Sequence, residues 1–439
     1  MVLGARREAG LDMSRRDQLR VLAGRSREII LAAALVGVAT GLAVAGFERL
    51  TVNVVFDRGV AHLPLWLLAF APGAGLAVAG LWLRGPGRGL PPLTADAYLQ
   101  SFHRREPLGL RALANRLVAA IATLGTGGAL GLEGPSIYLG ATLGSVAQRR
   151  FRRLLGGADP NLLLVAGAAA GIAAIFKAPA TGAIFAIEVP YQDDLARRML
   201  LPALVGAASG YVALVALNGT APLFPVSGSP PIGFADLAGA AALGLACGAG
   251  ARTFAWMLRR AKRLAGAAHP VARVVGAGAS IASLFAIGRL LTGESLVLTP
   301  GYGVVTWALD PRRSVALLLM ILVLRCLATS ATVAGGGVGG LFVPLVVAGA
   351  LVGRAFGEAF GQLDQSLFLV LGIAAFLGAG YRVPLAAVVF VAESTGRPGF
   401  VVPGLIAAVV AELLMADASV TPYQPASQLG GTPPTIDDP

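Results

Sequence analysis

Glu133 is the residue whose type and setting most directly suggest chemistry. It is the only charged residue in the stretch Gly127 to Gly140, GGALGLEGPSIYLG. A carboxylate in apolar surroundings needs hydrogen bonds or a proton, because an unpaired buried charge is costly. Pro135 follows closely, and proline is favoured in the first turn of a helix. We therefore expect Glu133 at the N-terminal end of a helix inside the apolar part of the protein.

The second half of the chain repeats this frame without the carboxylate. Gly340 to Pro344 reads GLFVP where Gly131 to Pro135 reads GLEGP, and the two prolines are 209 residues apart. Phe176 to Glu188, FKAPATGAIFAIE, is likewise repeated 205 residues later by Tyr381 to Glu393, YRVPLAAVVFVAE. Two matching blocks in the same order at nearly the same offset predict two homologous halves, as in many transporters.

Both glycine-rich runs are expected to place a helix N-terminus inside the membrane. Such an end presents free backbone N–H groups at the positive pole of the helix dipole, and in lipid these donors must be satisfied. Two such ends, one from each half, would form an anion site near the midplane. Neither GLEGP nor GLFVP contains Lys or Arg. Their absence suits a site that binds an anion weakly enough to release it.

The acidic residues of the repeated blocks allow different roles. Glu133 either complements the dipole of the helix that it begins, or occupies the anion site and leaves it when protonated or displaced, as a gate would. Glu188 and Glu393 recur at equivalent places, each eleven residues after a basic residue, Lys177 or Arg382. For this pair structural charge compensation is expected, with Lys177 and Arg382 as partners or as loop residues at helix starts.

Composition indicates the solvent that these residues meet. Of the 439 residues 56% are hydrophobic and only 13% are charged, and 59 are glycine. The mean hydropathy is +0.74, far too apolar for a soluble domain of this size. We count about ten segments long enough to cross a bilayer. The clearest are Ile29 to Leu50, Leu65 to Leu83, Phe234 to Leu258 and Ser314 to Val333.

The chain is expected to divide into five parts. These are a basic tail at 1–28, a first membrane repeat at 29–218, a linker at 219–233, a second repeat at 234–416 and a short tail at 417–439. The first tail contains seven arginines, which predicts a cytoplasmic N-terminus. Membrane orientation also explains the net charge of +12, so no nucleic-acid partner is expected.

The predicted fold is an all-α polytopic membrane protein of two repeats with broken helices that meet at a central anion site. Arg149 to Arg153, RRFRR, follows the helix after Pro135, whereas the flank after the Pro344 helix is far less basic. This difference favours inverted topology for the two repeats.

The residues that bind metals or form disulfides are scattered. Cys247 and Cys326 lie far apart in apolar segments, and His62, His103 and His269 share no ligand spacing. We expect no disulfide, metal or cofactor. No nucleophile and base are paired within a span, which leaves a membrane-embedded enzyme as a remote alternative.

Four segments together resemble the signature segments of the CLC family of chloride channels and chloride/proton antiporters. They are GLEGP, Ala166 to Glu188, Gly339 to Pro344 and Tyr381 to Glu393, and the likeness extends from about Arg27 to Met415. The resemblance implies tilted helices in two inverted halves and a homodimer with a separate pore in each subunit. Cytoplasmic regulatory domains, common in eukaryotic members, are not expected, which is typical of a prokaryotic-type member.

The resemblance also implies roles for particular residues. Glu133 falls on the gating glutamate of the family. The backbone amides at Leu132 to Gly134, with those of Leu341 and Phe342, fall on anion-coordinating positions.

Three positions depart from the family pattern or leave its register open. The first pore segment, usually glycine-serine-glycine-hydrophobic-proline, is best matched by GRGLP at Gly87 to Pro91, where Arg88 replaces the serine and Gly89 follows it. Tyr423 is the candidate pore tyrosine, with Thr421 as a competing register. Val189 stands where antiporters of the family typically carry a proton-relaying glutamate.

We therefore predict a passive or weakly proton-coupled pathway for chloride, or another small monovalent anion, gated by Glu133 in a prokaryotic inner membrane. Arg88, Gly89 and Tyr423 are expected to contribute to the anion site. A chloride/proton antiporter with another proton relay, and a fluoride exporter of the same family, remain open.

Overall fold

The structure is a computed structural model that describes residues 15–90, 92, 94–153, 155, 159–224, 226, 232–267, 269–361 and 366–427, with side chains from residue 27 onward. Parts of the expected N-terminal tail (1–14), linker (225 and 227–231) and C-terminal tail (428–439) lie outside these ranges. The described residues form sixteen α-helices, joined by turns and short π and 3-10 segments.

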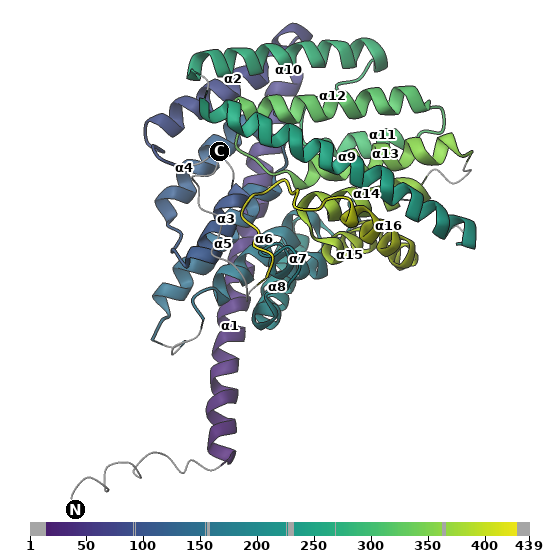
Figure 1. Ribbon diagram of the computed structural model, residues 1–439. Coiled ribbons are helices and arrows are strands. Elements are labelled where there is room, and N and C mark those ends of the chain that lie inside the picture. The colour runs from purple at the N-terminus through teal and green to yellow at the C-terminus, as the bar shows by residue number, and fades with distance from the viewer. Residues whose placement is uncertain are drawn as a thin grey trace, which may run out of the picture.

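Eight helices belong to each half of the chain, which Figure 1 distinguishes by colour. Those of the first half are α1 (Arg15–Glu48), α2 (Leu65–Arg84), α3 (Thr94–Arg104), α4 (Leu110–Leu124), α5 (Glu133–Arg150), α6 (Leu162–Phe176), α7 (Pro179–Glu188) and α8 (Leu200–Asn218). Those of the second half are α9 (Phe234–Ala267), α10 (Pro270–Thr292), α11 (Tyr302–Ala308), α12 (Val315–Ala334), α13 (Phe342–Ala359), α14 (Leu367–Tyr381), α15 (Pro384–Thr395) and α16 (Val401–Leu413).

Helix length and composition confirm an all-α polytopic membrane protein. Among the described residues, seven helical segments are long and apolar enough to cross a membrane. Four more apolar segments, which contain α6, α14, α15 and α16, are shorter than a full span. Short buried helices are tolerated at membrane depth because neighbouring protein satisfies their ends.

The centre of the molecule is built from two equivalent helix pairs. Every residue of α6 and of α14 is buried, and each helix packs on the one that precedes it, α5 or α13. A Cβ atom on Gly140 would collide with the carbonyl of Gly167, and one on Gly349 with the carbonyl of Gly372. Glycine therefore allows the same close crossing in both halves, as is usual for helices packed in lipid.

The connections after α6 and α14 are also equivalent. Lys177 follows α6 with φ 54° and Arg382 follows α14 with φ 58°, so both adopt the left-handed conformation that ends a helix. The next helices, α7 and α15, each begin at a proline. The repeated sequence blocks thus fold into the same helix, turn and helix.

The equivalent helices α7 and α15 run antiparallel to each other. Glu188, the last residue of α7, contacts the N-terminus of α15, and Glu393, near the end of α15, contacts the N-terminus of α7. Antiparallel counterparts are expected of inverted repeats, in which the symmetry axis lies in the membrane plane.

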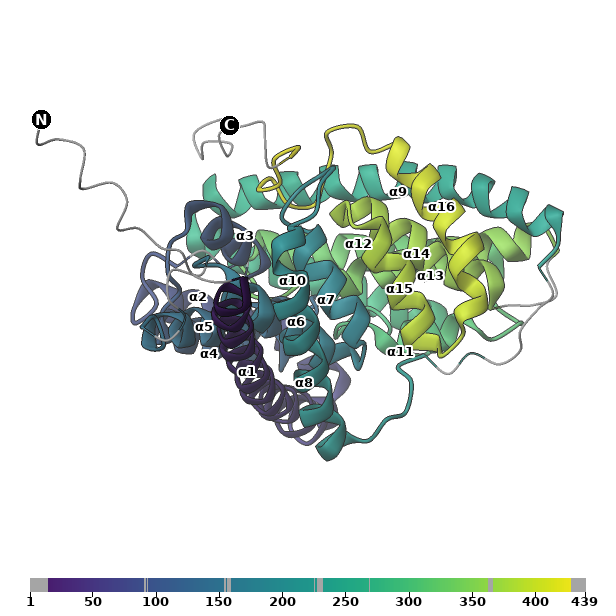
Figure 2. The ribbon, with the colours of Figure 1, turned by 90° about the horizontal axis from the view of Figure 1, so that it is seen from below.

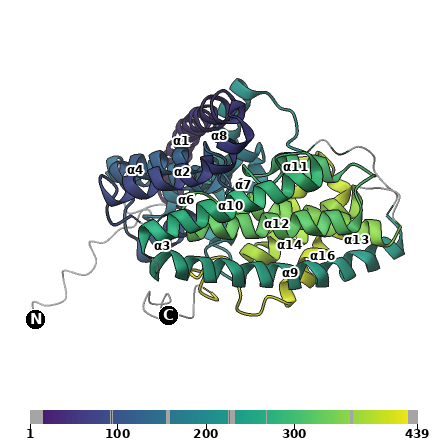
Figure 3. The ribbon, with the colours of Figure 1, turned by 90° about the horizontal axis from the view of Figure 1, so that it is seen from above.

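The C-terminal segment returns from α16 to the first half, as the yellow trace in Figure 2 shows. The backbone N–H groups of Gln192 and Asp193 donate to the carbonyls of Pro425 and Ala426 at 3.0 Å. On another face of the molecule α9, α10 and α12 lie side by side (Figure 3).

Candidate anion-binding site

The segments that precede α5 and α13 cross at the centre of the protein. Gly131 N–H donates to the Gly340 carbonyl at 2.9 Å, and Gly340 N–H donates back to the Gly131 carbonyl at 2.7 Å. This pair of hydrogen bonds holds the first turns of the two helices together. The amides at the start of α13 consequently lie against the first residue of α5.

Glu133 is that first residue, and its carboxylate binds to the N-terminus of α13. Oε1 accepts hydrogen bonds from the backbone N–H groups of Phe342 at 2.7 Å and Val343 at 3.4 Å. The side chain is 0% exposed, and Oε2 has no hydrogen-bond partner among the described residues. A negatively charged group thus lies on free N–H donors at the positive end of a helix, where an anion is favoured.

Glycine makes room for this carboxylate on two sides. A Cβ atom on Gly131 would collide with Glu133 Oε2, and a Cβ atom on Gly340 would collide with Oε1. Any larger residue at either position would displace the side chain or the backbone. The two glycines of the repeated motifs therefore form the space that holds the charged group.

Aromatic rings pack around the side chain of Phe342, the first residue of α13. The Phe342 ring lies 4.5 Å from that of Phe176, 4.9 Å from Phe390 and 5.7 Å from Phe185, measured between ring centroids. All four rings are buried. Their low polarity strengthens the electrostatic interactions of any charge bound at the α13 N-terminus.

Tyr381 supplies a hydroxyl group to this apolar surrounding. Its ring lies 5.6 Å from that of Phe185 and nearly perpendicular to it, and the residue is only 2% exposed. The phenol group lies near the backbone N–H of Leu341 and is within electrostatic range of Glu133. Sequence analysis did not assign Tyr381 to the site. The sequence repeat contains a pattern that points to it, because Tyr381 stands at the position that Phe176 occupies in the first half.

Four of the expected anion-coordinating residues lie together around Glu133. Leu132 and Leu341 directly precede α5 and α13 and are almost fully buried, and Phe342 donates to the carboxylate. Gly134 packs against Gly340, whose added Cβ atom would lie 2.6 Å from the Gly134 nitrogen. The structure thus brings Leu132, Gly134, Leu341 and Phe342 to one place.

A cavity of about 410 Å³ with several charged residues in its lining lies beside Tyr423, at the start of α3 and the end of α9. Arg84, Lys262 and Arg273 line it together with Asp96, which pairs with Lys262 at 3.1 Å. The lining is therefore positively charged overall, which favours anions. Burial raises the pKa of the Tyr423 phenol, so its hydroxyl keeps its proton at neutral pH.

Arg88 and Gly89 lie elsewhere. Both are exposed in the turn that follows α2, and neither lines the cavity beside Tyr423. Thr421 is buried, and its hydroxyl accepts from the Tyr423 N–H at 3.4 Å, so of the two only Tyr423 lines this cavity. The anion-binding roles of Arg88, Gly89 and Tyr423 stay predictions.

Glu188 and Glu393 have their charges compensated across the two halves. Glu188 accepts from the N–H groups of Leu385 and Ala386 at 2.9 and 2.7 Å. Glu393 accepts from the N–H groups of Ala180 and Thr181 at 2.8 and 2.7 Å. Compensation was expected, and its source is backbone amides at helix N-termini.

The basic residues of these blocks are bound elsewhere, as residues of the turns between helices. Lys177 donates to the carbonyls of Asn218 and Ala221. Arg382 pairs with Glu412 at 3.1 Å and with Asp193 at 3.3 Å.

Val189 directly follows α7 and is 2% exposed. Its carbonyl accepts from Gln424 Nε2 at 2.9 Å, and the same amide nitrogen donates to the Tyr381 carbonyl at 2.7 Å. The valine side chain itself has no group that binds a proton.

Known proteins are similar to this chain in sequence and in fold. Residues 94–416 match the family described as Voltage gated chloride channel. The H(+)/Cl(-) exchange transporter ClcA of Salmonella typhi is 30% identical over 428 residues, which cover 92% of this chain and 89% of that protein. ClcA of Salmonella newport has the same identity and coverage.

Solved structures share the fold. A slow cyanobacterial Cl-/H+ antiporter superposes with a TM-score of 0.77 at 23% identity, over 92% of this chain and 95% of that chain. A CLC-type fluoride/proton antiporter also has a TM-score of 0.77 at 23% identity, over 95% and 100% of the two chains. The chain therefore belongs to the voltage-gated chloride channel (CLC) family of anion transport proteins.

Proposed function

We propose that this protein transports chloride through the site at the α13 N-terminus and that Glu133 gates the pathway. The observation that carries the proposal is the pair of hydrogen bonds from Phe342 and Val343 to Glu133 Oε1. A chloride ion and a carboxylate oxygen both require N–H donors and positive potential, so they compete for this place.

The pathway opens when the Glu133 carboxylate no longer competes with chloride for the amides of α13. Protonation of Glu133 removes its negative charge and weakens both charge-assisted hydrogen bonds. The carboxyl group then leaves the amides, which become free to bind a permeating anion. The Tyr381 hydroxyl, beside the Leu341 amide, is placed to donate to the same anion.

The proposal also includes weak coupling between anion transport and proton movement. The side chain of Val189 provides no titratable group at the position that the resemblance assigns to the internal proton relay, and the neighbouring carboxylate of Glu188 is held by the amides of Leu385 and Ala386. A proton that reaches Glu133 from one side then has no side-chain route from that position to the other side. We propose that the protein moves anions passively or with loose proton coupling.

A chloride/proton antiporter is the second candidate. The names of the ClcA relatives and of the cyanobacterial structure describe proton exchange. The fluoride/proton antiporter among the structural neighbours adds fluoride to the anions that need testing. An antiporter would have to relay protons through water or through another carboxylate.

Flux from reconstituted liposomes tests these alternatives. Vesicles loaded with chloride or fluoride are diluted into an anion-free solution, and anion efflux and internal pH are recorded together, with and without a potassium ionophore. Chloride efflux that needs the ionophore and leaves the pH unchanged supports the proposal. Uphill proton movement driven by a chloride gradient supports the antiporter, and faster fluoride than chloride efflux supports a fluoride exporter. Absence of anion flux would contradict the proposed function.

Three further properties belong to this proposal. The seven arginines near the N-terminus favour a cytoplasmic N-terminus, which protease protection in right-side-out vesicles measures. A homodimer, implied by the family, is measured by cross-linking in membranes. We also propose that the protein is not an enzyme, because the proposed transport cycle moves ions and a proton but breaks no covalent bond of a substrate.

A further inference from the structure

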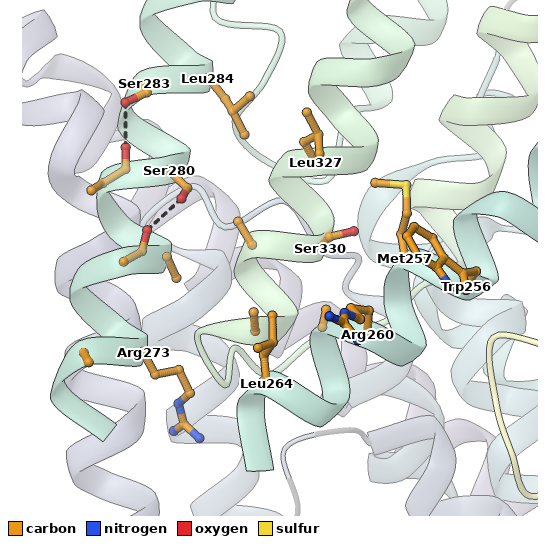
Figure 4. A pocket seen from close by; sticks show the side chains of 17 residues that line it. Trp256, Met257, Arg260, Leu264, Arg273, Ser280, Ser283, Leu284, Leu327 and Ser330 are labelled. Atoms are coloured by element: carbon orange, nitrogen blue, oxygen red, sulfur yellow. Dashed lines mark hydrogen bonds between the residues drawn. The ribbon is translucent and has the colours of Figure 1, made fainter. Parts of the chain in front are cut away.

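A groove of about 920 Å³ lies apart from the anion site, between α9, α10 and α12. These three helices lie side by side on one face of the molecule (Figure 3). Most of the lining is apolar, and it includes Leu264, Leu284 and Leu327 (Figure 4). Ser280 and Ser283 also line the groove, but their hydroxyls donate to carbonyls of their own helix. Apart from the Ser330 hydroxyl, which is buried without a hydrogen-bond partner among the described residues, its walls therefore suit hydrocarbon.

Two guanidinium groups lie at one end of this groove. Figure 4 shows Arg260 of α9 and Arg273 of α10 with Leu264 at its lower end, whereas Ser283 and Leu284 lie at the upper end. The lining contains no acidic residue among the described ones. Arg273 donates to the Ala265 carbonyl, but its Nε is buried and has no hydrogen-bond partner. Arg84, another cation, also acts on it electrostatically.

The two guanidinium groups and the apolar walls of the groove together suit a ligand that is amphipathic and negatively charged. A small anion would leave the apolar walls empty, and an uncharged lipid would leave both guanidiniums without a counter-charge. Trp256 also lines the groove and is 59% exposed, as is common where a side chain meets the lipid interface. A basic pocket between helices at one membrane surface is typical of lipid headgroup sites.

We propose that the groove between α9, α10 and α12 binds an anionic phospholipid, with the phosphate at Arg260 and Arg273 and an acyl chain along the helices. Arginine suits this role because its planar group donates two parallel hydrogen bonds to phosphate.

The same site has a connection to transport. Arg273 lines both this groove and the positively charged cavity beside Tyr423. A phosphate on Arg273 would lower the positive potential of that cavity and reduce local anion concentration. This second step rests on the proposed function, whereas lipid binding does not. We expect slower anion flux in anionic membranes than in neutral ones.

Native mass spectrometry of the full-length protein tests binding. The probes are phosphatidylglycerol and phosphatidylcholine with the same acyl chains, added in equal amounts to detergent-solubilised protein. The wild type should retain phosphatidylglycerol roughly tenfold better, and the double variant Arg260→Gln/Arg273→Gln should retain both lipids equally. Arg273→Lys keeps the charge and should retain much of the preference.

Arg289→Gln is the matched control. Arg289 lies at the other end of α10, where it donates to Ser295, so its loss removes one positive charge from the same helix and should leave the lipid preference unchanged. A double variant that elutes as a folded protein and still prefers phosphatidylglycerol overturns the proposal, as does a wild type without preference.

Flux measurements separate this inference from the proposed function. Wild-type protein should release chloride more slowly from phosphatidylglycerol than from phosphatidylcholine vesicles, and the double variant should lose most of that difference. Equal lipid dependence in the wild type and the double variant would contradict the link through Arg273. If neither protein transports anions in either lipid, the proposed function fails while the binding result stands.

Discussion

Phe342 donates its backbone N–H to Oε1 of Glu133 at 2.7 Å, across 209 residues of sequence and between the two halves of the protein. The contact joins the first residue of α13 to the first residue of α5. Because the donor is a backbone group, its N–H stays in place at every pH, whereas the carboxylate can gain or lose a proton. Control of the site therefore belongs to Glu133.

Glu133→Gln should abolish most of the pH dependence of anion flux. The amide is uncharged at every pH and cannot compete with chloride for the α13 amides as a carboxylate does. We expect wild-type flux to rise as the pH falls, because protonation vacates the amides. The variant should be fast at all pH values. Chloride efflux from liposomes between pH 4.5 and 8 measures both, and a variant that keeps the wild-type pH profile would remove Glu133 from the gate.

Gly340→Ala should change gating without removing any charge. The new Cβ atom would collide with Glu133 Oε1, so the carboxylate must leave its present position or the backbone must shift. We expect a higher flux at neutral pH than in the wild type. Gly46→Ala is the control, because a Cβ atom there meets nothing within 4 Å. If Gly340→Ala is as slow as the control while correctly folded, the carboxylate does not block the site.

Tyr381→Phe should weaken anion binding by roughly ten- to a hundredfold. The substitution removes only the hydroxyl beside the Leu341 amide and keeps the ring that packs on Phe185. A lost hydrogen bond to a charged group costs about 1.5–3 kcal/mol. Isothermal titration of chloride into purified protein measures the effect. Tyr423→Phe should change affinity less if Tyr381 is the main donor, and the reverse order would support Tyr423 as the pore tyrosine.

Val189→Glu should increase proton movement per chloride. It places a carboxylate at the position that the resemblance assigns to the internal proton relay, directly after the last residue of α7. Internal pH recorded during chloride efflux gives the ratio, and Val189→Gln is the matched uncharged control. An equal ratio in the two variants would show that the missing relay is not what limits coupling.

Glu393→Gln should destabilise the protein without changing its anion selectivity. The carboxylate accepts three hydrogen bonds at the α7 N-terminus, including one from the Thr181 hydroxyl at 2.6 Å. Loss of this charge should lower stability by about 2 kcal/mol, seen as a lower melting temperature in detergent. Glu106→Gln removes an exposed carboxylate and serves as the control. A melting temperature equal to that of the control would contradict the capping role.

Sequence reasoning was most successful where local signals define a helix end. The proline of GLEGP predicted a helix start at the place where α5 begins, and the repeat predicted its counterpart α13. The partners of Glu188 and Glu393 were beyond such reasoning, because each carboxylate contacts the opposite half about 200 residues away. Local spacing pointed to Lys177 and Arg382 instead.

The contacts of Arg325 could not be predicted from local sequence either. A charged residue in an apolar span suggests a functional site, yet its guanidinium donates to the carbonyls of Leu296 to Pro300 at 2.6 to 3.3 Å. The irregular backbone before α11 needs donors at membrane depth, and only the folded structure shows that Arg325 provides them. Tyr381 was missed for a related reason, since its hydroxyl acquires meaning only beside the Leu341 amide.

The exchange of caps between α7 and α15 has a consequence for how the chain is made. The amides of Ala180 and Thr181 stay without their acceptor until Glu393 has been synthesised, and bare amides are costly in lipid. The first half must therefore wait in the membrane in an unfinished state while some two hundred more residues leave the ribosome. The caps of α7 and α15 are therefore completed together and late, when α15 docks against α7.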